Sequence, residues 1–256
     1  MIPKTIHYCW FGRNPKPALA EKCFKSWKKH CPDYEIIEWN EDNFDISSAP
    51  LYVQQAYEAK KWAFVTDYVR LWAMTRFGGV YMDTDVELVG PIDAFLGNEA
   101  FSGFEDQTRI PTGIMASRKG FPLFEELLRF YETAQFYHSD GTMNTTTNVA
   151  TITDACLKHG LQQNGSFQVV NGFALYPRDY FCPLDYATGA MYKTENTAAI
   201  HWFSGSWHSE YQKKQRKKDL WSYRVYKMTR PLNRLGKWIL GETGYNKIRD
   251  FITGEK

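Results

Sequence analysis

Several features that are common in other protein classes are missing from this sequence. It contains no run of eighteen apolar residues, which excludes a transmembrane helix. Its opening, MIPKTIHYCWFG, lacks the charged start and the apolar centre of a secretion signal. Its five cysteines are an odd number without a CxxC pair, so we expect reduced, buried thiols and neither a disulfide framework nor a zinc knuckle. Together these absences predict a cytoplasmic protein.

The residues that are present suffice for a full core and a separate basic segment. The chain has 256 residues, of which 43% are hydrophobic, and this size fits one large α/β domain with a helical appendage. The net charge of +2 hides an asymmetry, because the segment 213–256 holds 13 Lys or Arg and 4 acidic residues. We therefore expect a main domain over residues 1–210 and a basic, amphipathic helical extension over residues 211–256.

The most informative stretch runs from Ala63 to Glu87. Its first part has apolar residues at helical spacing and stops at Gly78-Gly79, which predicts a helix that ends in a turn. Val80 to Met82 then predict a short strand that leads to Asp83 and Asp85. Because side chains alternate faces along a strand, we expect these two carboxylates to point the same way.

Two neighbouring carboxylates repel each other unless a cation or a shared proton offsets their charge. Magnesium and manganese ions suit such a position, because they prefer oxygen ligands and keep coordination positions open. The oxygens of a diphosphate can fill those positions. The pair Asp83 and Asp85 therefore predicts a divalent metal site that accepts a diphosphate.

At this point the sequence resembles the sugar-nucleotide glycosyltransferases with a DXD motif. The similarity is to family 32, which includes initiating mannosyltransferases and bacterial capsule and lipopolysaccharide enzymes, with clostridial glucosylating toxins as distant relatives. It covers Ile2 to about Phe104 and His201 to Trp207 well, and the middle third weakly. The residues that carry it combine a helix, a turn and a strand end: Ala63, Asp67, Arg70, Gly78-Gly79 and Tyr81-x-Asp83-x-Asp85.

The resemblance implies a fold and an activity. The fold is α/β of the glycosyltransferase-A type, a Rossmann-like, mainly parallel sheet flanked by helices. The activity is metal-dependent transfer of a hexose from a nucleotide sugar, preferably UDP-linked, to a saccharide or lipid-linked saccharide, with retention of anomeric configuration. The resemblance implies that Asp67 and Arg70 contact the donor sugar. It also implies that these two residues, with Asp83 and Asp85, are the catalytic residues. From the residues alone, Asp67 and Arg70 at positions i and i+3 also fit an internal salt bridge.

Aromatic residues near the start are candidates for the donor site. The alternation around Ile6 and Tyr8 predicts a first strand, and Trp10 and Phe11 follow where ligands bind in α/β sheets. The resemblance implies that an aromatic residue here holds the nucleobase, and Tyr81 is counted with the donor-binding residues. A tryptophan buried in the core is the alternative for Trp10.

A second motif lies at AIHWFSGSW, residues 199–207. The resemblance implies that His201 completes the metal site and that Ser206 and Trp207 hold the donor diphosphate. An imidazole suits manganese, and a hydroxyl and an indole N–H can each donate to a phosphate oxygen. His208 is near enough in sequence that the choice between His201 and His208 stays open.

Two loops are expected to contribute to the acceptor side. Glu105-Asp106-Gln107 lies between two predicted strands, and a carboxylate near an acceptor hydroxyl is the group that an inverting enzyme needs as a base. The segment from Arg178 to Tyr192 is predicted to be a loop that varies with the acceptor.

The basic extension allows two interpretations. Its basic residues accompany apolar ones at helical spacing, a pattern that favours an amphipathic helix on an anionic bilayer, at the inner face of the membrane. A terminal helix pair that packs on the main domain, with a solvated basic face, fits equally well. Nucleic-acid binding is not expected, since there is charge but no recognised motif.

Two other functions remain as alternatives. Aspartate-nucleophile phosphatases also place Asp-x-Asp after a strand, with Asp83 as nucleophile and Asp85 as acid and base. That interpretation leaves Asp67 and Arg70 without a task, and it finds Glu87 where a small hydroxyl residue is expected. The aromatic content of 16% suggests a carbohydrate-binding protein without turnover, although aromatic residues at core spacing explain most of that content.

Overall fold

The computed structural model describes residues 1–205 and 210–253. The chain divides into two units. Residues 1–185 and 190–205 form the first unit, and the second consists of Tyr186–Gly189 with helix α7 (Glu210–Thr253). The predicted division into residues 1–210 and 211–256 stays a prediction, because residues 206–209 lie outside the described part of the chain.

The first unit is built on a seven-stranded sheet in the order β2-β1-β3-β6-β5-β8-β7. Five of its strands run in one direction, and β6 and β7 run the other way. The predicted mainly parallel sheet is therefore confirmed. A separate two-stranded sheet pairs β4 (Val86–Leu88) with β9 (Ala199–His201). The strands of the large sheet are β1 (Thr5–Cys9), β2 (Glu35–Trp39), β3 (Gly79–Met82), β5 (Ala100–Gly103), β6 (Ile114–Ser117), β7 (Gln168–Val170) and β8 (Phe173–Tyr176).

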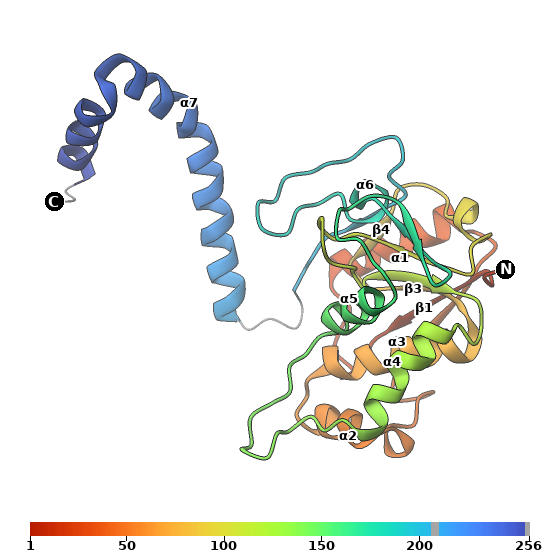
Figure 1. Cartoon of the computed structure of the whole chain (residues 1–256). Helices are drawn as coiled ribbons and strands as arrows, with labels where there is room; N and C mark the ends of the chain where they lie inside the picture. Colours follow the sequence, from red (N-terminus) through yellow and green to blue (C-terminus); the bar gives the residue numbers. More distant parts are fainter. Residues whose placement is uncertain (206–209, 254–256) are drawn as a thin grey trace. The chain divides into compact units, whose positions relative to one another are not determined.

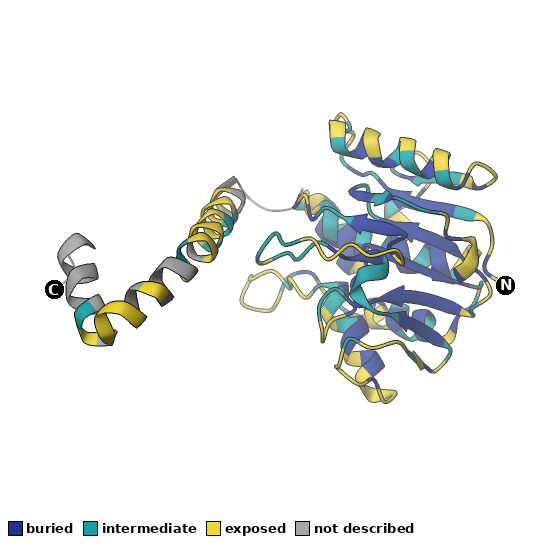
Figure 2. Ribbon diagram, turned by 90° about the horizontal axis from the view of Figure 1, so that it is seen from above, coloured by how far each residue is buried: buried dark blue, intermediate teal, exposed yellow. Residues whose placement is uncertain are grey.

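Helices cover both faces of this sheet, as predicted (Figures 1 and 2). The helices are α1 (Ala18–His30), α2 (Leu51–Glu58), α3 (Trp62–Phe77), α4 (Pro122–Thr133), α5 (Asn148–Lys158) and α6 (Arg178–Phe181), with 3-10 turns at Ile46–Ser48 and Asp93–Phe95. The short helix α6 lies inside the segment 178–192 that the sequence predicted as a loop. That prediction was wrong for Arg178–Phe181, because four residues carry too little periodicity to be recognised.

Alternation along the strands divides the core into two layers. Val80 and Met82 of β3 pack on the α1 side of the sheet, whereas Tyr81 between them packs on the side of α2, α3 and α4. The five cysteines are all buried and free, so their predicted burial is confirmed: Cys9, Cys23, Cys31, Cys156 and Cys182. In the described part of the chain, none of the helices combines the length and the hydrophobicity needed to cross a membrane.

Helix α3 is the central helix of this unit. It is apolar on nearly all sides, as is typical of a helix that is enclosed by neighbours. It ends where the N–H of Gly78 donates to the carbonyl of Met74 at 2.9 Å, with Gly78 at φ 70°. The His7 ring of β1 bonds the Gly78 carbonyl at 2.9 Å, and burial lowers the pKa of His7 to about 4, so this histidine is neutral at pH 7.

Gly79 permits the tight junction between α3 and β3. Its φ is +107°, and a Cβ atom there would lie 2.6 Å from the Thr5 carbonyl oxygen of β1. Both the backbone angle and the close approach of β1 therefore require glycine. The turn predicted from Gly78-Gly79 is confirmed, and it aims β3 so that Asp83 follows at its carboxyl end.

We predict that Gly79→Ala lowers the free energy of unfolding by about 2 kcal/mol or more, since a strained φ and a backbone clash add together. Gly97→Ala is the matched control, because a Cβ there meets nothing within 4 Å. The control should change stability by no more than about 0.5 kcal/mol. Chemical denaturation of both variants measures the difference, and equal stabilities would show that the junction relaxes without cost.

Candidate functional site

Three side chains from distant parts of the sequence form an acidic cluster. One potential ligand atom from each of Asp83, Asp85 and His201 lies within 4.8 Å of the others. Asp83 follows β3, Asp85 precedes β4, and His201 ends β9. Because β4 and β9 pair with Val86 opposite His201, the register of this small sheet places the imidazole beside Asp85. The predicted meeting of these three residues is thus found in the structure.

The two aspartates converge through a turn, not through strand alternation. Strand β3 ends at Met82, and Asp83 to Asp85 form a turn in which the N–H of Val86 donates to the Asp83 carbonyl at 2.9 Å. The Asp83 N–H donates to the Gly113 carbonyl at 2.7 Å, which fixes where the turn begins. The two carboxylates converge as expected, but the reason given for it, side-chain alternation along a strand, does not apply, because both aspartates lie beyond the end of β3. The predicted end of the strand at Met82 is confirmed.

Asp85 is held by the chain that returns at the end of the unit. Its Oδ1 lies 3.3 Å from Nε2 of His201, and its Oδ2 accepts a 2.7 Å hydrogen bond from the Ser204 N–H. Burial raises the pKa of Asp85, but the charge of His201 and these hydrogen bonds outweigh burial and hold the pKa well below its usual range. Burial lowers the pKa of His201, but Asp85 outweighs it and raises that pKa well above the usual value. The two side chains form an ion pair.

Gly113 makes room for the imidazole, a role that no pattern in the sequence indicated. A Cβ atom at Gly113 would lie 2.7 Å from both Cε1 and Nδ1 of His201. Any side chain at this position would push the ring away from Asp85. Only the three-dimensional structure reveals this requirement, because Gly113 and His201 are far apart along the chain.

Asp83 is held from the opposite side by buried groups of β3 and of the central helix α3. Its Oδ1 accepts a 2.8 Å hydrogen bond from the Tyr81 hydroxyl and lies 3.3 Å from an Arg70 nitrogen. Tyr81 is only 1% exposed, and the Arg70 guanidinium lies 4.7 Å from the centre of its ring. The buried Tyr81 hydroxyl therefore fixes the orientation of the Asp83 carboxylate. Its predicted contact with the donor stays a prediction.

Arg70 also joins Asp83 to Asp67. An Arg70 nitrogen lies 3.2 Å from Asp67, and another donates a 2.7 Å hydrogen bond to the Thr112 carbonyl. Asp67 and Arg70 are 7% and 5% exposed, so this is a buried network. The internal salt bridge considered from the sequence is present and extends to the acidic cluster. Contact of the pair with a sugar stays a prediction.

Helix α5 supplies partners for Asp67 that the sequence did not indicate. The Asn148 N–H donates to Asp67 Oδ2 at 3.2 Å, and the Asn148 side chain donates to the Asp67 carbonyl at 2.6 Å. The Tyr131 hydroxyl in turn donates to Asn148 at 2.7 Å. Burial nevertheless raises the pKa of Asp67 to about 6, against the opposing charge of Arg70. The only signal in the sequence was the asparagine itself, and asparagine is too common to be specific.

The candidates for nucleobase contact have different environments. Phe11 is 4% exposed and packs against Phe44, so its ring belongs to the core. Trp10 is half-buried, and its indole N–H donates to the Asn14 carbonyl at 2.7 Å. The prediction that an aromatic residue here holds the base therefore depends on Trp10. It stays a prediction, as do the roles of Ser206, Trp207 and His208, which lie outside the described residues.

The loop after β5 brings a further carboxylate close to the cluster. Glu105 lies 3.3 Å from Arg109, and its side chain is 12% exposed. Burial raises the pKa of Glu105, while the charges of Arg109 and His201 oppose that rise. The influence of His201 shows that this loop, predicted to face an acceptor, lies near the acidic cluster.

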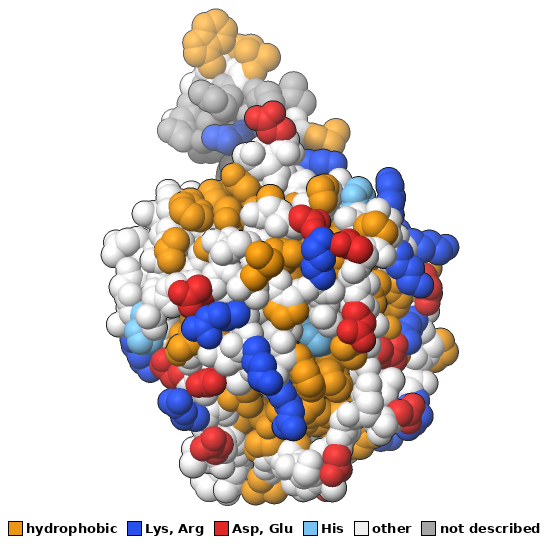
Figure 3. Space-filling model, turned by 90° about the vertical axis from the view of Figure 1, so that its right-hand side faces the viewer, with side chains coloured by type: hydrophobic (Ala, Val, Ile, Leu, Met, Phe, Trp, Pro, Cys, Tyr) orange, Lys and Arg blue, Asp and Glu red, His pale blue; other side chains and the backbone are white. Residues whose placement is uncertain are grey.

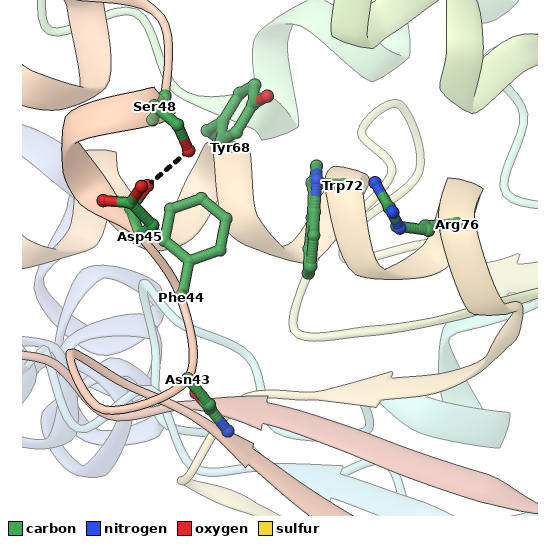
Figure 4. Close-up of a pocket in the computed structure, with 8 residues that line it drawn as sticks. Asn43, Phe44, Asp45, Ser48, Tyr68, Trp72 and Arg76 are labelled. Atoms are coloured by element: carbon green, nitrogen blue, oxygen red, sulfur yellow. Dashed lines mark hydrogen bonds between the residues drawn. The ribbon is translucent and has the colours of Figure 1, made fainter.

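A separate hollow of about 200 Å³ lies along α3 (Figure 4). It opens between the segment after β2 and the side of α3 that carries Tyr68, Trp72 and Arg76. None of the residues of the acidic cluster lines it. The hollow is therefore distinct from the candidate site.

Comparison with known proteins supports the predicted resemblance. Residues 17–102 match the family model described as a glycosyltransferase sugar-binding region containing a DXD motif. This segment includes the Asp67–Arg70 pair and the two aspartates of the cluster. The predicted resemblance to DXD glycosyltransferases is confirmed over this segment.

Two individual proteins illustrate the extent of the similarity. The chain is 28% identical over 132 residues to inositol phosphoceramide mannosyltransferase 3 of Schizosaccharomyces pombe, a match that covers 50% of this chain and 36% of the relative. The chain thus spans well under half the length of this curated relative. Among solved structures, the PaToxG glycosyltransferase shares 19% identity over 61% of this chain and 69% of its own, with a TM-score of 0.50. The latter match confirms the predicted glycosyltransferase-A type of fold.

We predict that Arg70→Met lowers the free energy of unfolding by about 3–5 kcal/mol near neutral pH, because it leaves two carboxylates without their buried cation. Arg70 lowers the pKa of Asp67, so its removal should raise that pKa further above about 6. An acid whose folded pKa is raised destabilises the fold above that pKa and ceases to do so once protonated. The difference from wild type should therefore shrink between about pH 8 and about pH 5.5.

Arg76→Met provides the control for this experiment. Arg76 lies on the same helix, is exposed, and contacts the Trp72 ring at 5.6 Å. Denaturation of both variants at the two pH values separates a buried network from a general effect of arginine removal. A pH-independent loss in Arg70→Met would contradict the charge network.

Proposed function

We propose that this protein, whose residues 17–102 match a DXD-type sugar-binding region, is a metal-dependent glycosyltransferase. It moves a hexose from a nucleotide sugar to a saccharide or lipid-linked saccharide acceptor, with retention of anomeric configuration. The observation that carries this proposal is the convergence of Asp83, Asp85 and His201 at the end of the matched segment's strand. A rival function must explain the same convergence.

The residues of the cluster fit a divalent cation. Two carboxylates and one imidazole nitrogen within 4.8 Å offer the oxygen and nitrogen ligands that Mn²⁺ accepts, and Mg²⁺ prefers the oxygens. The strong electrostatic coupling of Asp85 and His201 supports this fit, since a cation can replace the proton that His201 carries. A bound ion supplies charge that stabilises a leaving nucleoside diphosphate.

The chain's own residues hold the aspartates in place from two sides. Tyr81 and Arg70 fix the orientation of Asp83, and the Ser204 N–H with His201 fixes that of Asp85. Such fixed positions reduce the reorganisation that charge development requires. We extend the proposal to Asp67 and Arg70, whose acceptor and donor groups orient the donor sugar. In this arrangement Trp10, Ser206 and Trp207 bind the nucleotide.

The donor and the acceptor follow from the resemblance. Similarity to bacterial enzymes and toxins favours a UDP-linked sugar and a role in capsule or lipopolysaccharide synthesis. The name of the Schizosaccharomyces pombe relative adds mannose and an inositol phosphoceramide as candidates for sugar and acceptor, so GDP is tested beside UDP. A lipid-linked acceptor is presented at a membrane, and we therefore include peripheral contact with an anionic membrane on the cytoplasmic side.

The phosphatase alternative has weaker support. It requires Asp83 as a free nucleophile, but one oxygen of Asp83 accepts the Tyr81 hydroxyl and faces Arg70. It also assigns no task to the pairing of His201 with Asp85. A carbohydrate-binding protein without turnover does not explain why two carboxylates and a histidine share one site.

We predict that UDP or GDP binds only when Mn²⁺ or Mg²⁺ is present, and that Asp85→Asn abolishes this binding, because the variant loses a charged ligand of the ion. Calorimetric titration of each nucleotide with and without Mn²⁺ measures both effects. The fold of Asp85→Asn is checked by circular dichroism. A variant that binds nucleotide as the wild type does would exclude Asp85 as a metal ligand.

Asp140→Asn is the matched control, because it makes the same chemical change in an exposed loop. Its affinity for nucleotide should equal that of the wild type. If the wild type binds neither nucleotide under any of these conditions, the transferase proposal fails. Trapping of an aspartyl phosphate would then favour the phosphatase.

A further inference from the structure

Helix α7 displays a stripe of apolar side chains on its surface. Trp221, Val225, Met228, Leu235 and Ile239 are spaced by four, three, seven and four residues, which places them along one side of an α-helix. Trp221, Met228 and Ile239 are 67%, 76% and 62% exposed. The stripe ends at Gly241, where the backbone leaves the helical conformation with φ 68° and ψ 163°.

Within the second unit, no other described segment covers this stripe. Tyr186–Gly189 is the only other segment of that unit among the described residues. Tyr186 contacts Arg216 at 4.1 Å, and a Cβ at Gly189 would lie 3.3 Å from Leu220, so both approaches fall before the stripe begins. An elongated apolar surface of this kind is unusual for a protein surface unless another apolar phase covers it.

The charges beside the stripe have a single sign. Arg224, Lys227 and Arg230 are exposed and lie between the apolar positions along the helix but off their line. From Lys213 to Lys237 the sequence has ten basic residues and one acid, Asp219. The face of the first unit in Figure 3 is different, because there Lys and Arg alternate with Asp and Glu. The segment from 213 to 237 therefore attracts an anionic partner.

The apolar stripe and its basic flanks decide which kind of partner can cover this side of α7. A second copy of α7 would bring two rows of basic residues together, so the flanking charges oppose a homodimer along this seam. A spanning helix is excluded for the described residues, because α7 is not apolar enough to cross a bilayer. An anionic bilayer satisfies both features, since its acyl region covers the stripe and its headgroups neutralise the flanks. Tryptophan, found here at 221 and 238, favours that interface.

We propose that the part of α7 from Glu210 to Leu240 lies in the plane of an anionic lipid bilayer, with Trp221, Val225, Met228, Leu235 and Ile239 inserted below the headgroups. This inference deepens the proposed function, on which it rests for the presence of a lipid-linked acceptor. Gly241 ends the inserted segment, because the helix changes direction there. The bilayer then keeps the protein beside an acceptor that diffuses in two dimensions.

Co-sedimentation of the full chain with vesicles tests this proposal. Vesicles of phosphatidylcholine alone are compared with vesicles that also contain phosphatidylglycerol. Binding should be at least about tenfold tighter to the anionic vesicles and should weaken at high salt. Met228→Glu places a charge in the stripe and should weaken binding by about tenfold or more.

Ser222→Glu is the matched control, because it adds the same charge at an exposed position off the stripe. It should weaken binding only about twofold, through charge alone. Equal losses in the two variants would overturn insertion of the stripe. Absence of binding by the wild type would overturn the whole proposal. In that case sedimentation of the free protein distinguishes self-association from packing of α7 on its own chain.

Nucleotide binding in the same preparations separates this inference from the proposed function. Wild type that binds Mn²⁺ and UDP or GDP but no vesicle contradicts only the membrane contact. Wild type that binds anionic vesicles but no nucleotide contradicts only the transferase. Met228→Glu should keep the nucleotide affinity of the wild type, since Met228 belongs to no part of the acidic cluster.

Discussion

The buried guanidinium of Arg70 is the constraint on which the site depends. A charged group that is 5% exposed must be paired, and Arg70 meets this requirement with Asp67, Asp83 and the Thr112 carbonyl. These partners come from α3 itself, from the residue after β3 and from the segment just before β6. One side chain thus sets the distance between the central helix and two strands of the sheet. The aspartates after β3 can vary in position only as far as this network allows.

The other half of the site depends on a different kind of contact. Asp85 is held by His201 and Ser204, which come from the last part of the first unit. The pairing of β4 with β9 and the absence of a side chain at Gly113 permit that approach. One aspartate therefore belongs to the rigid interior, and the other belongs to a small sheet at its edge. A cation at the cluster would join these two parts.

The sequence predicted what local patterns determine. The enclosed helix, its glycine turn and the strand that leads to Asp83 follow from residues that are neighbours in sequence. The prediction that His201 lies beside Asp83 and Asp85 came from the family resemblance alone. No periodicity in the sequence connects residue 85 with residue 201. The bend at Asp83, the clearance at Gly113 and the bonds from Asn148 were not predictable. Each is decided by a backbone that approaches from far along the chain, and no local preference records it.

The position of His201 affects how the protein is assembled during synthesis. Arg70, Asp67 and Asp83 can pair once the first half of the chain has left the ribosome, apart from the bonds that Asn148 adds later. The third member of the cluster emerges only when most of the first unit has been made. The cluster therefore cannot be completed before most of the first unit has been synthesised. A chain that ends before residue 201 lacks the third member of the cluster, whatever the state of the rest of the first unit.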